Sequence, residues 1–179
     1  MMKIKKGVRV LSFGMILHII SVWSGVILAQ GEADREKLIN ISREMMESAH
    51  YCALITIDST GHSSARMMDP FLPEEDLIVW MGTNINSRKI REIRNNPVVT
   101  LYYSDPDGGG YITISGTAEL VDDPGEKTGR WKESWESFYS EDKDNYILIK
   151  VTPDKVEVLS YKHGITGNQV NWRTPVVEF

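Results

Sequence analysis

The sequence predicts a mainly β fold: a closed or nearly closed antiparallel barrel with few helices. Three observations support this class. About seven segments of regular length have strand character, few segments have helical periodicity, and strands and helices do not alternate as they would around a parallel sheet. With 179 residues the chain is expected to form one domain, preceded by residues 1–30 and followed by a tail over 162–179.

Composition excludes several classes of protein. Hydrophobic residues make up 41% of the chain and charged residues 25%, which is ordinary for a globular domain. The single cysteine, Cys52, excludes a disulfide framework and a cysteine-based metal cluster, so we expect it to be a small buried hydrophobe. The net charge of -5 argues against a nucleic-acid-binding protein.

The first thirty residues have the layout of a secretory signal. Basic residues over 3–9 precede an uncharged run over 10–29, and a polar stretch begins at Gln30. This order predicts export, with cleavage after Ala29 or Gln30. The apolar run is also long enough for an uncleaved membrane anchor, which remains the alternative.

The N-terminal half of the mature chain starts with a helix and continues with strands. Residues 32–50 carry apolar side chains at helical spacing, and 51–58 is rich in β-branched and aromatic residues. A turn over 59–61 then leads into a return strand over 63–68. Prolines at 70 and 73 break the chain before a short buried strand over 77–81.

A short helix and two long strands follow. Residues 87–95 have helical character and stop before Pro97, because the residue preceding proline disfavours the helical region. The strand over 98–104 and the alternating strand over 111–120 are joined by a glycine-rich turn.

The C-terminal part is predicted to contain one helix and a last hairpin. Asp123 and Pro124 are a typical helix start, and the helix would carry Trp131, Trp135 and Phe138 on one side. Strands over 145–152 and 155–161 would form a hairpin around Pro153. The predicted barrel core includes eight aliphatic residues: Leu54, Ile78, Val99, Leu101, Ile112, Ile114, Leu148 and Ile149.

Common catalytic motifs are missing. The sequence has no nucleophile elbow, no zinc-protease motif and no phosphate-binding loop of the Walker type. The four histidines have no partners at metal-ligand spacing, so we predict no metal site and assign no catalytic residue.

One polar cluster, over residues 82–89, has the composition of a phosphate site. Ser87 can cap the following helix, and Arg88 and Lys89 place two cations beside the free N–H groups of its first turn. Antiparallel pairing could bring Arg66 to the same place. The alternative is a capped surface helix whose basic side chains are merely solvated; cations at this end oppose the helix dipole, which favours an anionic ligand.

These residues resemble a known family. Arg66-Met67-Met68, then Gly82-Thr83-Asn84 with Ser87-Arg88-Lys89, then Asn95-Asn96-Pro97 occur in the order typical of the FMN-binding split barrels. The chain resembles the pyridoxamine 5'-phosphate oxidase-like proteins, specifically their general-stress-protein branch, over roughly residues 35–160.

The resemblance implies a fold, a cofactor and an assembly. It implies a six-stranded antiparallel Greek-key split barrel and a homodimer that binds FMN at the dimer interface. Arg66, Ser87, Arg88 and Lys89 would hold the FMN phosphate. The ribityl chain and ring would be lined by Met67, Met68, Trp80, Met81, Gly82 and Thr83.

Departures from the family pattern bear on activity. Asp69-Pro70-Phe71 and Tyr111 stand where the vitamin-B6 oxidases have a lysine and a glutamine, and their C-terminal Arg-x-His has no counterpart here. These differences count against pyridoxamine phosphate oxidation. The resemblance therefore implies a flavin-dependent oxidoreductase acting on an unknown small molecule. The alternatives are a non-catalytic carrier of flavin or another planar cofactor such as haem, and an exported structural domain.

Overall fold

The computed structural model describes residues 32, 34–139 and 145–179, and the predicted signal segment therefore lies outside the described residues. The chain divides into two compact units, residues 1–37 and 38–179. Of the first unit, the described residues 32 and 34–37 are helical. In the described part of the chain no helix is long and apolar enough to span a membrane.

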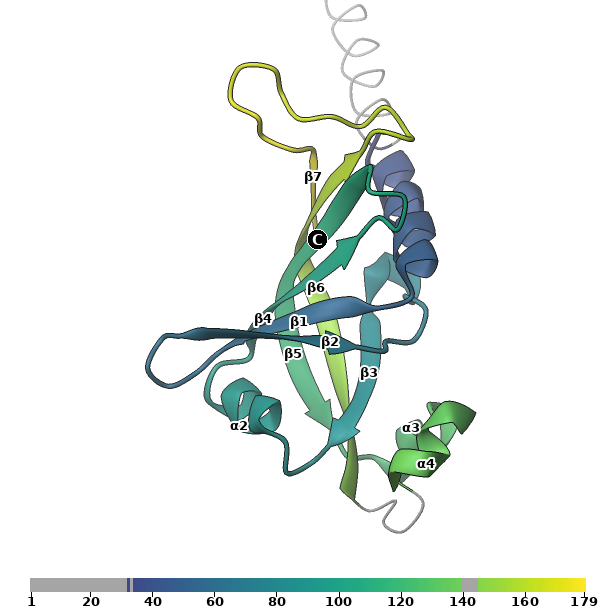
Figure 1. Ribbon diagram of the computed structural model, residues 1–179, viewed down its shortest axis with the longest axis vertical. Helices are drawn as coiled ribbons and strands as arrows, with labels where there is room; N and C mark the ends of the chain where they lie inside the picture. Colours follow the sequence, from purple (N-terminus) through teal and green to yellow (C-terminus); the bar gives the residue numbers. More distant parts are fainter. Residues whose placement is uncertain (1–31, 33, 140–144) are drawn as a thin grey trace, which may run out of the picture. The chain divides into compact units, whose positions relative to one another are not determined.

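The second unit is built on one antiparallel sheet that curls into a split barrel (Figure 1). Along the sheet the strands follow the order β2-β1-β4-β5-β6-β3, with a short seventh strand, β7, paired to β6. Their bounds are β1 Cys52–Ile57, β2 Ser63–Met68, β3 Val79–Asn84, β4 Val98–Ser104, β5 Gly110–Val121, β6 Tyr146–Ser160 and β7 Val176–Glu178.

The two end strands of the sheet meet just beyond β2. Pro70 pairs with Met81 of β3 in an antiparallel bridge, and the Phe71 N–H donates to the Trp80 carbonyl at 2.8 Å. This contact closes one side of the barrel and joins the chain after β2 to the middle of β3.

The predicted last hairpin is wrong, because β6 runs through Pro153 without a turn. Gly116 of β5 pairs with Pro153, and the register shifts between Ser115 and Gly116. A proline without an N–H is tolerated in a strand where a bulge interrupts the ladder. A Cβ on Gly116 would lie 2.4 Å from the Thr152 carbonyl oxygen, so the close approach at this irregularity requires glycine.

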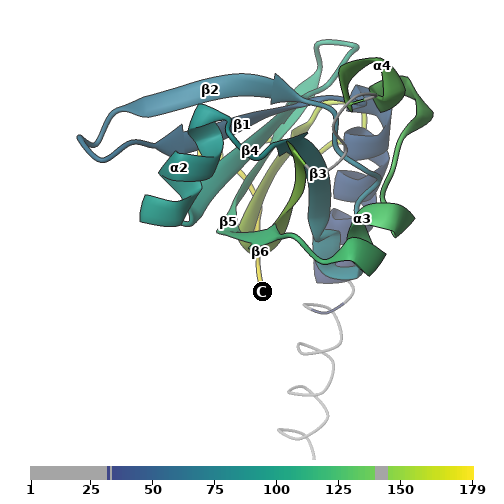
Figure 2. The ribbon, with the colours of Figure 1, turned by 90° about the horizontal axis from the view of Figure 1, so that it is seen from below.

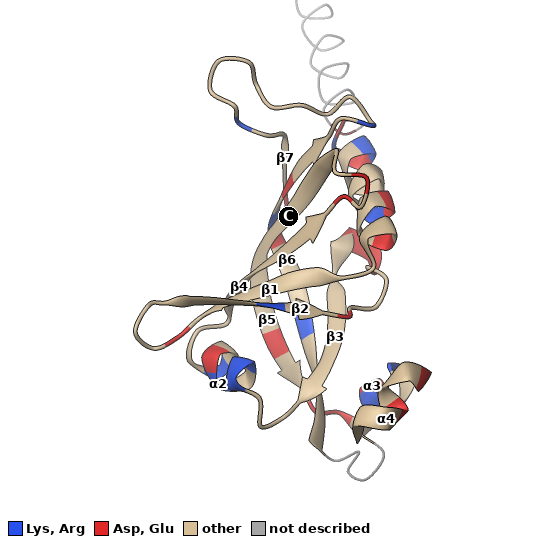
Figure 3. Cartoon of the chain, viewed as in Figure 1, with Lys and Arg blue, Asp and Glu red and all other residues tan. Residues whose placement is uncertain are grey.

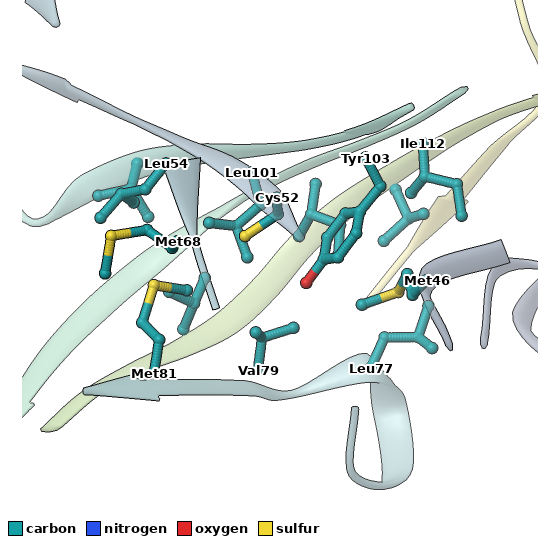
Figure 4. Close-up of a cluster of buried hydrophobic side chains, with 14 of the residues drawn as sticks. Met46, Cys52, Leu54, Met68, Leu77, Val79, Met81, Leu101, Tyr103 and Ile112 are labelled. Atoms are coloured by element: carbon teal, nitrogen blue, oxygen red, sulfur yellow. The ribbon is translucent and has the colours of Figure 1, made fainter. Parts of the chain in front are cut away.

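Two separate apolar clusters form the core. The larger one fills the barrel and contains Cys52, which is fully buried as predicted (Figure 4). The smaller cluster packs Trp80, Trp135, Tyr146 and Leu148 on the other face of β3. Six of the eight predicted core residues lie in the larger cluster, whereas Leu148 belongs to the smaller one and Ile78 is only partly buried against it.

Helical segments surround the sheet (Figure 2). Residues 38–49 are helical, as predicted, and bury one face. The remaining segments are η1 Glu75–Leu77, α2 Arg88–Asn95, α3 Pro124–Gly129, η2 Glu133–Trp135 and α4 Glu136–Tyr139.

The predicted tryptophan helix is wrong in its extent. Asp123 caps α3 as expected and accepts from the Glu126 N–H at 2.9 Å, but α3 ends at Gly129. An extended stretch then resets the helical phase before η2. Trp131 and Trp135 therefore pack against Tyr146, whereas Phe138 is 79% exposed.

Candidate functional site

The best-defined polar site lies where β3 turns into α2. The Asn84 carbonyl and side chain accept from the N–H groups of Ser87 and Asn86 at 3.0 and 2.8 Å, which closes the turn. Ser87 takes the N-cap position of α2, but its side chain makes no capping hydrogen bond, contrary to the sequence expectation. Its Oγ is buried without a hydrogen-bond partner in the described part of the chain. A buried unpaired hydroxyl is costly, so a water molecule or a polar ligand is expected to satisfy it at this helix end.

Three cations gather around this turn. Arg66 comes from the inward face of β2, while Arg88 and Lys89 belong to the first turn of α2 (Figure 3). Lys89 Nζ donates to Thr83 Oγ1 at 2.8 Å, and Thr83 is buried at the end of β3. The barrel therefore brings together side chains that are 23 positions apart in the sequence.

One buried carboxylate, Glu92, organises two of these cations. Arg66 Nη2 lies 2.8 Å from Glu92 Oε2, and Arg88 Nε lies 3.0 Å from Oε1. The Glu92 side chain is 6% exposed, and it also accepts from Thr56 Oγ1, which accepts from Arg66 in turn. Three cations and one carboxylate leave two positive charges at the site, the number that a phosphate dianion balances.

The electrostatics of Lys89 and Glu92 reflect this arrangement. Burial is the main cause that lowers the pKa of Lys89, and the nearby charge of Arg66 lowers it further. Burial alone would raise the pKa of Glu92, but hydrogen bonds from Thr56 and Arg66 and the guanidinium charges together lower it. Glu92 therefore stays ionised, and Lys89 lies in a net positive field.

Sequence reasoning missed Thr56 and Glu92. Glu92 lies four residues after Arg88, the spacing of an ion pair on a helix, and that signal was available in the sequence. Thr56 lies on the inward face of β1 together with Leu54. Its cross-strand partner on β2 is Ser64, two residues before Arg66, so the register of the sheet is what brings Thr56 close to Arg66.

The residues predicted to line a flavin ring fall into three places. Met68 and Met81 lie in the barrel core, where both are buried (Figure 4). Met67 points outward and is 67% exposed. Trp80 and Gly82 lie on the opposite face of β3, where a Cβ on Gly82 would meet the rings of Tyr146 and Trp135. The structure thus brings together Arg66, Thr83, Ser87, Arg88 and Lys89, and distributes the other five.

A second polar constellation, Ser160, His163 and Glu44, has a different role. Ser160 Oγ lies 2.9 Å from His163 Nδ1, and His163 Nε2 lies 3.3 Å from Glu44. Ser160 is fully buried, so no substrate can reach its hydroxyl. Together with a 2.7 Å contact between Lys162 and Glu44, the group ties the helix over 38–49 to the end of β6.

The described residues contain no group of three or more His, Cys, Asp or Glu side chains that could hold a metal ion.

Comparisons with known proteins identify the fold and the family. The search of curated proteins found no significant match. Among solved structures, General Stress Protein 26 from Bacillus anthracis str. Sterne is 23% identical, with a TM-score of 0.63 over 79% of this chain and 98% of that one. A protein related to general stress protein 26 from Clostridium acetobutylicum is 19% identical, with a TM-score of 0.67 over 80% and 96%.

A third solved structure is named for its cofactor. A pyridoxamine 5'-phosphate oxidase-related, FMN-binding protein from Nostoc punctiforme is 14% identical, with a TM-score of 0.52 over 77% of this chain and 91% of that one. These likenesses share the split-barrel fold. The family model described as pyridoxamine 5'-phosphate oxidase like matches residues 36–174, which is most of the chain. The chain therefore belongs to the pyridoxamine 5'-phosphate oxidase-like family.

Proposed function

We propose that this protein binds FMN and uses it as a flavin-dependent oxidoreductase on a small molecule. The observation that carries the proposal is the cationic cluster of Arg66, Arg88 and Lys89 around the start of α2. Its net charge of two matches a phosphate monoester dianion, and the unpaired Ser87 Oγ supplies a further donor. Family membership and the FMN-binding relative support the same cofactor.

The chain's own residues would bind and orient the cofactor. Arg66 and Lys89, both partly buried, would hold the phosphate with less screening than surface charges experience. Arg88, whose side chain is 65% exposed, would contribute mainly long-range attraction. The backbone of the adjoining segments of β2 and β3, over 67–68 and 80–83, would line the ribityl chain and ring, because most of their side chains are buried in the two apolar clusters. Bound flavin would supply hydride or electron transfer, and no residue is assigned as a catalytic acid or base.

We propose further that the protein works as a homodimer. The outward side chains of β1, β2 and β4 carry no charge, although the chain as a whole is acidic. Tyr102, Val98 and Met67 are 39%, 54% and 67% exposed on this face. An uncharged, partly apolar sheet face of this kind is suited to pairing with a second copy.

Export is part of the proposal. Residues 1–30 would be removed as a secretory signal, with an uncleaved membrane anchor as the alternative. Intact-mass analysis of protein from its native cell tests this: a mass that still includes residues 1–29 would exclude cleavage.

The absorbance spectrum of the purified protein, followed by titrations with FMN and riboflavin, tests cofactor binding. Flavin bands, and FMN binding at least tenfold tighter than that of riboflavin, are expected because riboflavin lacks the phosphate. A Soret band would indicate haem instead. Reduction of the bound flavin by NAD(P)H and reoxidation by a small-molecule acceptor would separate an enzyme from a carrier.

Single substitutions locate the site. A charge-assisted hydrogen bond contributes about 1.5–3 kcal/mol, so Arg66→Ala and Lys89→Ala should each weaken FMN binding by roughly ten- to a hundredfold. Arg94→Ala, an exposed arginine on the last turn of the same helix, is the matched control. Affinities within about twofold in all three variants would refute the proposed phosphate site.

A further inference from the structure

A hollow of about 520 Å³ lies between the C-terminal end of the helix over 38–49 and the segment that follows β2. Its size is in the range of small-molecule sites. Most of its lining is apolar or aromatic. The lining residues are Met46, Glu47, His50, Tyr51, Asp69, Pro70, Phe71, Leu72, Pro73, Tyr103 and Lys132.

The one lysine in this pocket is already saturated. Lys132 Nζ donates to Asp69 Oδ1 at 2.5 Å and to the Pro70 carbonyl at 2.6 Å, and it lies 4.9 Å from the centre of the Phe71 ring. The other carboxylate oxygen of Asp69 accepts from Trp135 Nε1 at 3.2 Å. An ammonium has three donors, so Lys132 has little capacity left to bind an anion.

The charge that remains is negative. Glu47 is exposed at the pocket, and no ion pair or hydrogen bond engages its carboxylate within residues 38–139 and 145–179. Since Asp69 and Lys132 neutralise each other, and with His50 counted as neutral at pH 7, the pocket carries one uncompensated negative charge beside apolar walls. This is the opposite electrostatic character to that of the cluster at the start of α2.

We propose that this pocket binds a small apolar or aromatic molecule that carries a protonated amine, and that it disfavours phosphorylated or carboxylate ligands. The ring or alkyl part would contact Phe71, Leu72 and Tyr51, and the amine would face Glu47. The charge of Glu47 selects among ligands of similar shape, and the apolar walls supply most of the affinity.

The pocket adjoins the segment proposed to line the flavin ring. Asp69 and Pro70 follow Met68 directly, and Pro70 pairs with Met81. A ligand held here would lie next to a flavin bound as proposed, and this placement rests on the proposed function. Binding to the pocket does not depend on it.

The test compares three probes with one ring and different charges: benzylamine, benzyl alcohol and benzoate. Their dissociation constants are measured by saturation-transfer NMR or calorimetry at low salt, on the flavin-free protein at pH 7. We expect benzylamine to bind about two- to fivefold tighter than benzyl alcohol, the range of a partly exposed charge pair, and benzoate to bind more weakly than either. FMN binding is measured separately, so its absence would refute only the flavin proposal.

Reversing the charge of Glu47 tests whether the probes bind in this pocket. Glu47→Lys should reverse the order so that benzoate binds tightest, and Glu119→Lys, an exposed glutamate on β5 outside the pocket, should leave it unchanged. Glu47→Gln should remove the preference for the amine over the alcohol. No binding of any probe, or the same order in Glu47→Lys as in the unchanged protein, would overturn the proposal.

Discussion

Replacing Glu92 by glutamine should destabilise the free protein and tighten FMN binding at the same time. The carboxylate is 6% exposed and holds Arg66, whose side chain is 18% exposed, at 2.8 Å. Glutamine keeps the shape and can still bond Thr56, but it turns a charge-assisted bond into a neutral one and leaves Arg66 without its counter-ion. The difference between the two kinds of bond is about 1–2 kcal/mol, and the uncompensated charge adds to it.

The effect on binding has the opposite sign. A phosphate held by Arg66 would be repelled by the Glu92 carboxylate, and two unit charges about 8 Å apart interact by about 2 kcal/mol at an effective dielectric constant of about 20. Screening by water and salt reduces this, so we expect FMN to bind about tenfold tighter to Glu92→Gln, a gain of about 1.4 kcal/mol.

Two measurements separate these effects. Urea unfolding without ligand should show a loss of about 2 kcal/mol, and flavin fluorescence quenching at fixed salt should show the tighter binding. Glu119→Gln, an exposed glutamate on β5, serves as the control and should change neither quantity. Weaker FMN binding in Glu92→Gln would mean that Glu92 positions Arg66 for the phosphate rather than competing with it, and would refute the electrostatic argument.

Three further predictions concern pH, packing and assembly. FMN affinity should rise as the pH passes about 6, because the phosphate becomes a dianion. At alkaline pH the affinity should begin to fall before the pH reaches 10.5, the usual lysine pKa, because burial and Arg66 lower the pKa of Lys89. Lys89→Arg should keep the affinity high to a higher pH in a fluorescence titration, and an unchanged alkaline limit would contradict this. Gly116→Ala should lower stability by about 1–3 kcal/mol in urea unfolding, since its Cβ would meet the Thr152 carbonyl oxygen at 2.4 Å. Gly129→Ala, whose Cβ meets nothing within 4 Å, should cost far less, and equal losses would count against the packing argument. Tyr102→Lys should convert a dimer to a monomer in light scattering at micromolar concentration, whereas Val170→Lys, at a 90% exposed position in the C-terminal segment, should not; a dimer in both variants would place the interface elsewhere.

The local periodicity of the sequence determined most of the barrel. Strands over 63–68 and 98–104 were predicted with their observed ends, because alternating burial leaves a period of two in the sequence. The inward face of β5 followed from the same rule. Periodicity failed where the structure departs from regular geometry: Pro153 is a turn signal in isolation, but pairing with Gly116 at a bulge lets β6 continue through it.

The candidate site was determined partly by sequence and partly by tertiary structure. The order of Ser87, Arg88 and Lys89 at a helix start was visible in the sequence, because a helix end and its free N–H groups are local features. The meeting of Arg88 and Arg66 on Glu92 depends on which strands pair across the curled sheet, and no local pattern encodes that pairing. The same limit applies to the pocket beside Glu47, whose walls come from the helix over 38–49, the segment after β2, β4 and the chain after α3. Saturation of Lys132 by Asp69, 63 positions away, decides the charge of that pocket, because a lysine already bonded to a carboxylate and a carbonyl has little left to offer an anionic ligand.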